Sequence, residues 1–206
     1  IILIDQSSSM KQAAGAVSAA TGIFDTPLDS CDADLHITYF GVEGVWPGTV
    51  FDENHRTYLN SIAPASTIFA GDQGHVGFRT EQGANAVEDL SNHFDWRPDA
   101  CRAIFYISDE ELDSFAPTGD IANENAVTNE AIVAAQNNSV TVFTHFIDHQ
   151  SKPINIKLNY EDLAESTGGI FQYSTNQNVD PALYSDLLPK IVCNSCNACK
   201  LNDFIK

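Results

Sequence analysis

The amino-acid sequence predicts an α/β fold with a doubly wound, mostly parallel central sheet flanked by helices on both faces. Short apolar runs alternate along the chain with longer stretches of helical spacing, which is the pattern of such folds. The run 103–107 is continuously apolar, as expected for a central strand that is buried on both faces. Hydrophobic residues make up 43% of the 206 residues, enough for one sizeable core despite a formal net charge of −18.

Six segments are expected to be strands, each for its own reason. Residues 1–4 are all aliphatic, 35–40 alternate between apolar and polar, and 102–107 and 140–147 are dominated by apolar and β-branched residues. The Gly-, Val- and aromatic-rich stretch 42–51 surrounds the turn signal Trp46-Pro47-Gly48, which favours a third strand entered by a hairpin. The last and shortest candidate is 170–173.

Helices are expected between these strands. Residues 11–24 are rich in alanine, 55–62 end before Pro64, and the last helix has Pro181 in its first turn. Apolar residues recur at helical spacing in the other segments, of which the shortest ends before two glycines. The full set is 11–24, 55–62, 81–94, 120–136, 160–166 and 181–192.

The charge pattern disfavours several classes of partner. The ten Lys and Arg residues are scattered among 28 Asp and Glu residues, whereas binding to nucleic acid or to an anionic membrane surface needs clustered basic side chains. No apolar run approaches the ~18 residues of a membrane span, so no direct membrane insertion is expected. The acidic surface favours solubility and can hold divalent cations.

Five cysteines allow two interpretations. Cys31 and Cys101 are isolated, whereas Cys193, Cys196 and Cys199 form a C-x-x-C-x-x-C motif. Three thiolates would leave a zinc ion one ligand short, so we favour disulfides formed in an oxidising compartment, with one odd thiol. Cys31 and Cys101 each precede an expected strand, which would place them near the end of the last helix, where disulfides would tie the C-terminal tail to the sheet.

Oxygen-bearing side chains follow the expected strands. Asp5-Gln6-Ser7-Ser8-Ser9 comes after the first, Ser108-Asp109-Glu110-Glu111 after the central run and Asp148 after 140–147. Ligands bind beyond the carboxyl ends of strands in doubly wound sheets. Hard oxygen donors suit Mg²⁺, Mn²⁺ or Ca²⁺, although Ser7 or Ser9 could equally cap a helix.

These motifs resemble a known site when taken together. Asp5-x-Ser7-x-Ser9, then Thr80 before a helix, then Asp109 after the central strand resemble the metal-ion-dependent adhesion site of von Willebrand factor type A domains, which have a Rossmann-like fold. The resemblance covers residues 1–192 as one domain and leaves 193–206 as a Cys-rich tail. It implies direct coordination by Ser7, Ser9 and Thr80, and coordination largely through water by Asp5 and Asp109.

The sequence also departs from the family pattern. Glu110 and Glu111 stand where a glycine usually follows the aspartate, so they are expected either to repel an incoming carboxylate or to hold a second Ca²⁺. The stretch 66–79 is longer than usual and either shapes partner choice or covers the site. Only four residues precede Asp5, so we expect a longer natural polypeptide or a processed N-terminus.

Other chemistry has weaker support. His145 and His149 are four residues apart, but they flank a strand end, where this spacing does not favour a metal pair. No nucleophile elbow, G-x-x-x-x-G-K or G-x-G-x-x-G motif occurs, so serine hydrolysis and nucleotide binding by those loops are not expected.

The resemblance implies a non-enzymatic domain, extracellular or at the cell surface. Through its bound divalent cation, Mg²⁺ or Ca²⁺ with Mn²⁺ as a further candidate, the domain would capture an Asp or Glu of a protein or extracellular-matrix partner. The alternative is a structural subunit of a surface filament or multidomain adhesin, in which the ion only stabilises loops. A hydrolase that activates water on the metal is a third reading, for which the sequence offers no evident general base.

Overall fold

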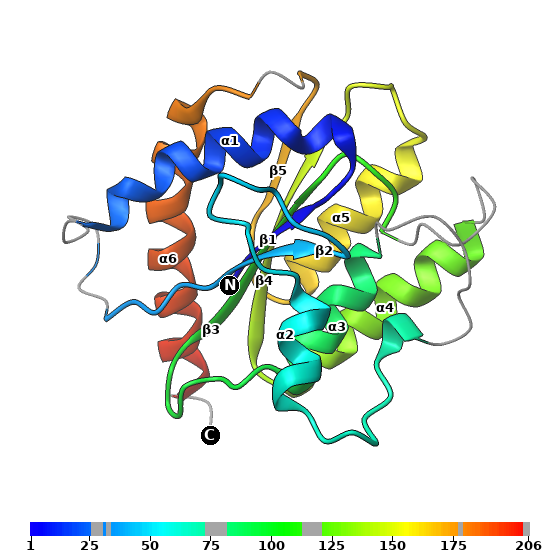
Figure 1. Cartoon of the computed structure of the whole chain (residues 1–206). Coiled ribbons are helices and arrows are strands. Elements are labelled where there is room, and N and C mark those ends of the chain that lie inside the picture. The colour runs from blue at the N-terminus through cyan, green and yellow to red at the C-terminus, as the bar shows by residue number, and fades with distance from the viewer. Residues whose placement is uncertain (26–30, 32–33, 73–81, 113–120, 177–178, 204–206) are drawn as a thin grey trace.

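The computed structural model describes residues 1–25, 31, 34–72, 82–112, 121–176 and 179–203 (Figure 1). Short 3-10 turns at Ser8–Met10, Thr21–Asp25 and Ala70–Asp72 accompany the longer elements. The strands are β1 (Ile2–Asp5), β2 (Tyr39–Val42), β3 (Arg102–Ser108), β4 (Val140–Ile147) and β5 (Phe171–Ser174). The helices are α1 (Lys11–Ala20), α2 (His55–Ile62), α3 (Gly83–His93), α4 (Ile121–Asn137), α5 (Ile154–Ser166) and α6 (Pro181–Asp203).

The five strands form one sheet in which every pairing is parallel, in the order β2-β1-β3-β4-β5. Ile4 at the centre of β1 lies opposite Gly41 of β2 on one side and Ile107 of β3 on the other. The chain therefore moves outward from β1 in one direction and from β3 in the other. The gap between the carboxyl ends of β1 and β3 is the switch point at which ligands bind in doubly wound sheets.

Alternating strand residues divide the core into two layers, as the predicted doubly wound fold requires. Leu3, Tyr106 and Val142 pack with α2, α3, α4 and α5, whereas Ile4 and Phe105 pack with α1 and α6. Figure 1 shows the same division, with α1 and α6 together on one side of the sheet and the other four helices on the opposite side. The central strands are buried on both faces, which explains their continuous apolar sequence.

The expected third strand over 42–51 is wrong. β2 ends at Val42, and the following residues turn back over the carboxyl end of the sheet, with the Trp46 amide donating to Phe51 O at 2.7 Å. Glu43 and Gly48 have φ values of 55° and 81°, which are incompatible with an extended strand. The Gly and Pro signals mark this loop, and they do not mark a hairpin.

Two helices are longer than expected. α5 begins at Ile154 because Ile156, Tyr160 and Leu163 form one buried face. α6 continues past residue 192, the expected end of the domain, and includes Pro189. The two disulfides described next hold these additional turns of α6 against the domain.

Two disulfides join α6 to distant parts of the chain. Cys31 is bonded to Cys193 and Cys101 to Cys199, while Cys196 is a free, partly exposed thiol. This confirms the expectation of disulfides with one odd cysteine, which is typical of chains that mature in oxidising compartments. Within the described residues, no helix is both long and apolar enough to cross a bilayer.

Candidate functional site at the carboxyl ends of β1 and β3

The turn after β1 orients its side chains toward one another. Asp5, the last residue of β1, is fully buried, and its Oδ1 accepts a hydrogen bond from the Ser7 amide at 2.6 Å. The Ser7 hydroxyl lies 3.0 Å from both Asp5 Oδ2 and Ser9 Oγ. Ser7 precedes the 3-10 turn Ser8–Met10, yet its side chain makes no capping hydrogen bond, and neither does the residue that caps α1. The geometry therefore does not support helix capping as the role of Ser7.

Asp109 brings β3 into the same cluster. Its carboxyl group is 1% exposed, and its Oδ1 accepts from the Ser7 hydroxyl at 3.1 Å across 102 positions of sequence. Ser108, just before it, donates to Asp5 Oδ2 at 2.9 Å. Four of the five predicted metal-site residues, Asp5, Ser7, Ser9 and Asp109, thus meet at the switch point of the sheet. Ser7 and Ser9 are partly exposed, so the cluster is accessible from their side.

The loop after β2 covers the turn that carries these residues. The Trp46 indole donates to the Asp5 carbonyl oxygen at 3.0 Å, a long-range contact that the turn signal Trp46-Pro47-Gly48 does not reveal. Gly44 packs against the Gln6 side chain so closely that a Cβ would collide with it. Gly83 similarly lets the first turn of α3 approach the Tyr106 ring. The loop therefore packs on the β1 turn, while α3 packs closely on β3.

His149 is the main residue of this region that the sequence analysis did not assign to the site. Its Nδ1 lies 3.1 Å from Asp109 Oδ2, but the two atoms are not aligned as a hydrogen bond and each is buried without a hydrogen-bond partner. The Gln150 amide nitrogen, which can only donate, lies 3.0 Å from His149 Nε2. His145 instead lies inside the domain, where its ring contacts Tyr184 and Ser174, so the two histidines do not form a metal pair.

Lys152 compensates the negative charge of Glu110 and Glu111. Its ammonium group is paired with both carboxylates, so their negative charge is compensated next to the site. Burial alone would lower the pKa of Lys152, but its hydrogen bonds and ion pairs with these carboxylates outweigh burial and raise the pKa. Tyr160 donates to the Glu110 carbonyl oxygen at 2.8 Å, and burial raises the pKa of this phenol well above its usual value. Glu110 and Glu111 are therefore held by a cation of the chain itself.

Two further residues do not join the described cluster. Asp148 follows β4 as expected, but its carboxylate accepts from the Lys152 amide at 2.7 Å and from the Tyr173 hydroxyl at 2.9 Å, so it organises its own loop. Thr80, the fifth predicted ligand, lies outside the residues that the structure describes. Its place in the site stays a prediction.

The oxygen cluster can be tested for its fit to a divalent cation. The described residues contain no group of three or more His, Cys, Asp and Glu side chains that could hold a metal ion, so any ion here would depend on the serine hydroxyls. Neighbouring ligands in an octahedral Mg²⁺ shell are about 2.9–3.0 Å apart, given Mg–O distances near 2.1 Å. The Ser7–Ser9 oxygen pair, at 3.0 Å, has this spacing, and the Ser7–Asp109 pair, at 3.1 Å, is close to it; both pairs are also within hydrogen-bond distance.

The Ser7 hydroxyl has more acceptors nearby than it has protons to donate. The single hydroxyl proton of Ser7 cannot be donated to Asp5 and Asp109 at once, although both carboxylates lie within 3.1 Å. Asp109 Oδ2 makes no hydrogen bond and lies 3.1 Å from His149 Nδ1. The donor set therefore fits a hard cation in its chemistry and in the spacing of its oxygens.

Comparisons with known proteins add no family to this description. No protein-family model matches the chain, and no curated protein is significantly similar to it in sequence. Sequence and structure together show an α/β fold with a five-stranded parallel sheet. The functional argument consequently depends on the site itself.

Proposed function

We propose that this chain is a von Willebrand factor type A-like binding domain that captures an Asp or Glu side chain of a partner on a divalent cation. The meeting of Asp5, Ser7, Ser9 and Asp109 at the β1/β3 switch point is the observation that carries the proposal. Thr80 would complete the coordination shell. The bound ion would be Mg²⁺ or Ca²⁺, with Mn²⁺ as a further candidate.

The donor set explains why such a domain could bind an acidic group although the chain is itself strongly acidic. The two serines contribute neutral oxygens, so the ion would keep much of its positive charge and would supply the local attractive field. Asp5 is buried behind Ser7, where it would act through hydrogen bonds and water rather than as a direct ligand. The two disulfides favour an extracellular or surface location for this activity.

A peptide-display selection would test the proposal. Random peptides selected on the immobilised protein in Mg²⁺ and eluted with EDTA are expected to be enriched in Asp or Glu. Ser9→Ala should abolish this capture, because it removes a ligand oxygen. Ser8→Ala is the matched control, since Ser8 is an exposed serine of the same turn and should leave capture unchanged.

Two results would contradict the proposal. One is the absence of acidic peptides from the EDTA eluate; the other is equal capture by the Ser9→Ala and Ser8→Ala proteins. Circular dichroism of each variant would show whether the fold is retained. If the protein instead associates with copies of itself equally well in EDTA, the alternative role of a structural subunit is favoured.

A further inference from the structure

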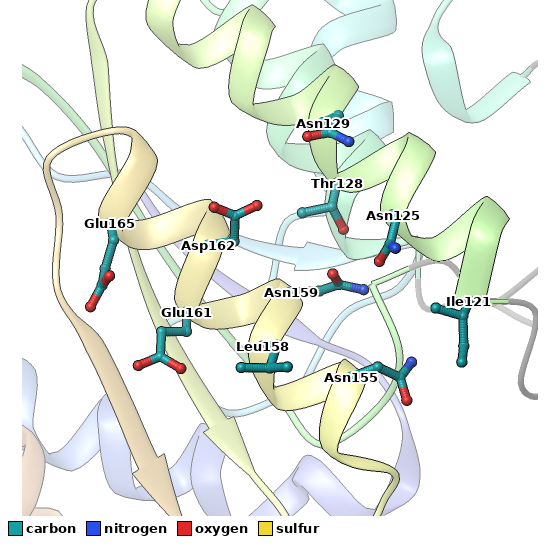
Figure 2. Close-up of a pocket in the computed structure, with 10 residues that line it drawn as sticks. All are labelled: Ile121, Asn125, Thr128, Asn129, Asn155, Leu158, Asn159, Glu161, Asp162 and Glu165. Carbon is teal, nitrogen blue, oxygen red and sulfur yellow. The ribbon is translucent and has the colours of Figure 1, made fainter.

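A groove between α4 and α5 forms a second concave region that the proposed function does not use. Its volume is about 510 Å³, within the ~300–1,000 Å³ range of ligand sites. Figure 2 shows that side chains from both helices line it. None of the predicted metal-site residues is among its lining residues. The groove therefore requires an explanation of its own.

Asn159 is an unsatisfied hydrogen-bond donor in this groove. It is 7% exposed, and its Nδ2 is buried without a hydrogen-bond partner. Figure 2 shows the side chain pointing from α5 toward α4, into the space between the helices. A buried amide that lacks a partner costs about 1–3 kcal/mol. A ligand with a carbonyl or hydroxyl oxygen at this point would remove that cost.

The groove also carries uncompensated negative charge. Glu161, Asp162 and Glu165 line it, and none of the ten described residues that line it is basic. Lys157, the basic residue of α5, instead lies 4.7 Å from the centre of the Tyr173 ring, on the side of β5. A cationic group is thus the complementary charge for this part of the groove.

Two exposed apolar side chains also line the groove, among its polar ones. Leu158 on α5 is 51% exposed and Ile121 on α4 is 50% exposed, and both line the groove. A ligand that satisfies all three features has an apolar group, a hydrogen-bond acceptor and a positive charge in succession. A polyamine lacks the acceptor, and a neutral sugar lacks the charge.

We infer that the α4–α5 groove binds a basic peptide segment of a partner protein, with an apolar residue near Arg or Lys. The peptide's apolar side chain lies against Leu158 and Ile121, a backbone carbonyl oxygen accepts from Asn159 Nδ2, and the basic side chain pairs with the carboxylates on α5. This binding involves no metal ion, so it is independent of the cation site at the switch point.

Two-dimensional NMR of the ¹⁵N-labelled protein would test the inference, with the probes acetyl-Leu-Arg-Gly-Arg-amide and acetyl-Leu-Glu-Gly-Glu-amide. The basic peptide should shift the Asn159 side-chain amide signals and the backbone signals of α4 and α5, equally with and without EDTA. The acidic peptide should shift none of them. Raising the salt concentration should weaken the binding several-fold, because the carboxylates are exposed to solvent.

Charge variants identify the surface that binds. Glu161→Gln/Glu165→Gln should raise Kd about tenfold, while Asp52→Asn/Asp186→Asn, which removes the same charge from exposed positions outside the groove, should change it less than about twofold. Equal weakening by both double variants would overturn the inference. So would a lack of shifts with the basic peptide, or equal shifts with the acidic one. Loss of binding in EDTA would also overturn it.

Discussion

The two ends of the parallel sheet are fixed by different kinds of interaction. Near the amino end of β3, Cys101 is joined covalently to Cys199 of α6, and a second bond joins Cys31 to Cys193. At the carboxyl ends of β1 and β3, hydrogen bonds among Asp5, Ser7, Ser9, Ser108 and Asp109 connect the loops. Disulfides thus crosslink one end of the sheet, whereas the loops at the other end are joined by hydrogen bonds among buried and partly exposed oxygens.

Breaking the covalent end should have the largest effect on stability. Cys101→Ser/Cys199→Ser opens a crosslink between positions 98 residues apart, and removal of such a disulfide costs roughly 2–5 kcal/mol of unfolding free energy. Urea denaturation monitored by circular dichroism would measure the loss. Cys196→Ser is the control, because this thiol is not part of a disulfide, and it should change stability little. Similar urea midpoints for the double variant and the control would show that the crosslink does not stabilise the sheet.

Acidification should weaken the contact between His145 of β4 and Tyr184 of α6. Burial lowers the pKa of His145 to about 4, and its ring lies 3.1 Å from the Tyr184 hydroxyl of α6. Between pH 6.5 and 4, His145 is therefore protonated in the unfolded state, where its pKa is near 6.5, but mostly neutral in the folded state. The unfolding free energy therefore has its full value above pH 6.5 and is lower by about 2 kcal/mol per such histidine at pH 5.

His55 adds to this loss, since burial lowers its pKa to about 4 as well. Thermal melts at pH 7.5 and 5.0 would measure the combined effect. His145→Gln should reduce the difference between the two pH values, whereas His36→Gln, at an exposed position, should not. An identical pH dependence in wild type and His145→Gln would contradict the assigned role of His145.

Glu88 should make a smaller contribution to the pH dependence of stability, and one of opposite sign to that of the histidines, because acidification removes its unfavourable charge. It lies on α3, and burial together with the nearby Asp89 and Glu130 raises its pKa to about 7. A carboxyl group whose folded pKa is raised destabilises the fold fully above pH 7 and not at all below about pH 4.5. Glu88→Gln should therefore raise the unfolding free energy by about 1 kcal/mol at pH 8, after allowance for its partial exposure, and change little at pH 4.5. Urea titrations at the two pH values would check this, and equal effects at both would contradict it.

The sequence predicted the regular parts of the fold well, for identifiable reasons. β4 coincides with the expected strand 140–147 because its mostly apolar and β-branched residues are buried on both faces, and α2 matches 55–62 because Asn54 and Pro64 frame it. The loop 43–51 was mistaken for a strand because its aromatic residues resemble strand residues. Trp46 in fact closes over the β1 turn, and only tertiary contacts reveal this.

Part of the candidate site was predictable for a similar reason. Asp5, Ser7, Ser9 and Asp109 lie directly after strands, and parallel strands bring such residues to one edge. His149 and Lys152 were missed because they reach Asp109 and Glu110 from the loop after β4, whose path the sequence does not determine. Their position after the carboxyl end of a strand next to β3 was the one available signal.

Isothermal titration of the chelator-treated protein with Mg²⁺ and Mn²⁺ tests the central claim most directly. We predict one saturable site per chain. Ser9→Ala and Asp109→Ala should each weaken it tenfold or more, whereas Ser8→Ala should leave it unchanged. Ion binding should also raise the melting temperature, by an amount corresponding to about 2.7 kcal/mol at a hundredfold excess over Kd. No saturable binding of either ion, or undiminished binding by the Ser9→Ala protein, would contradict the account.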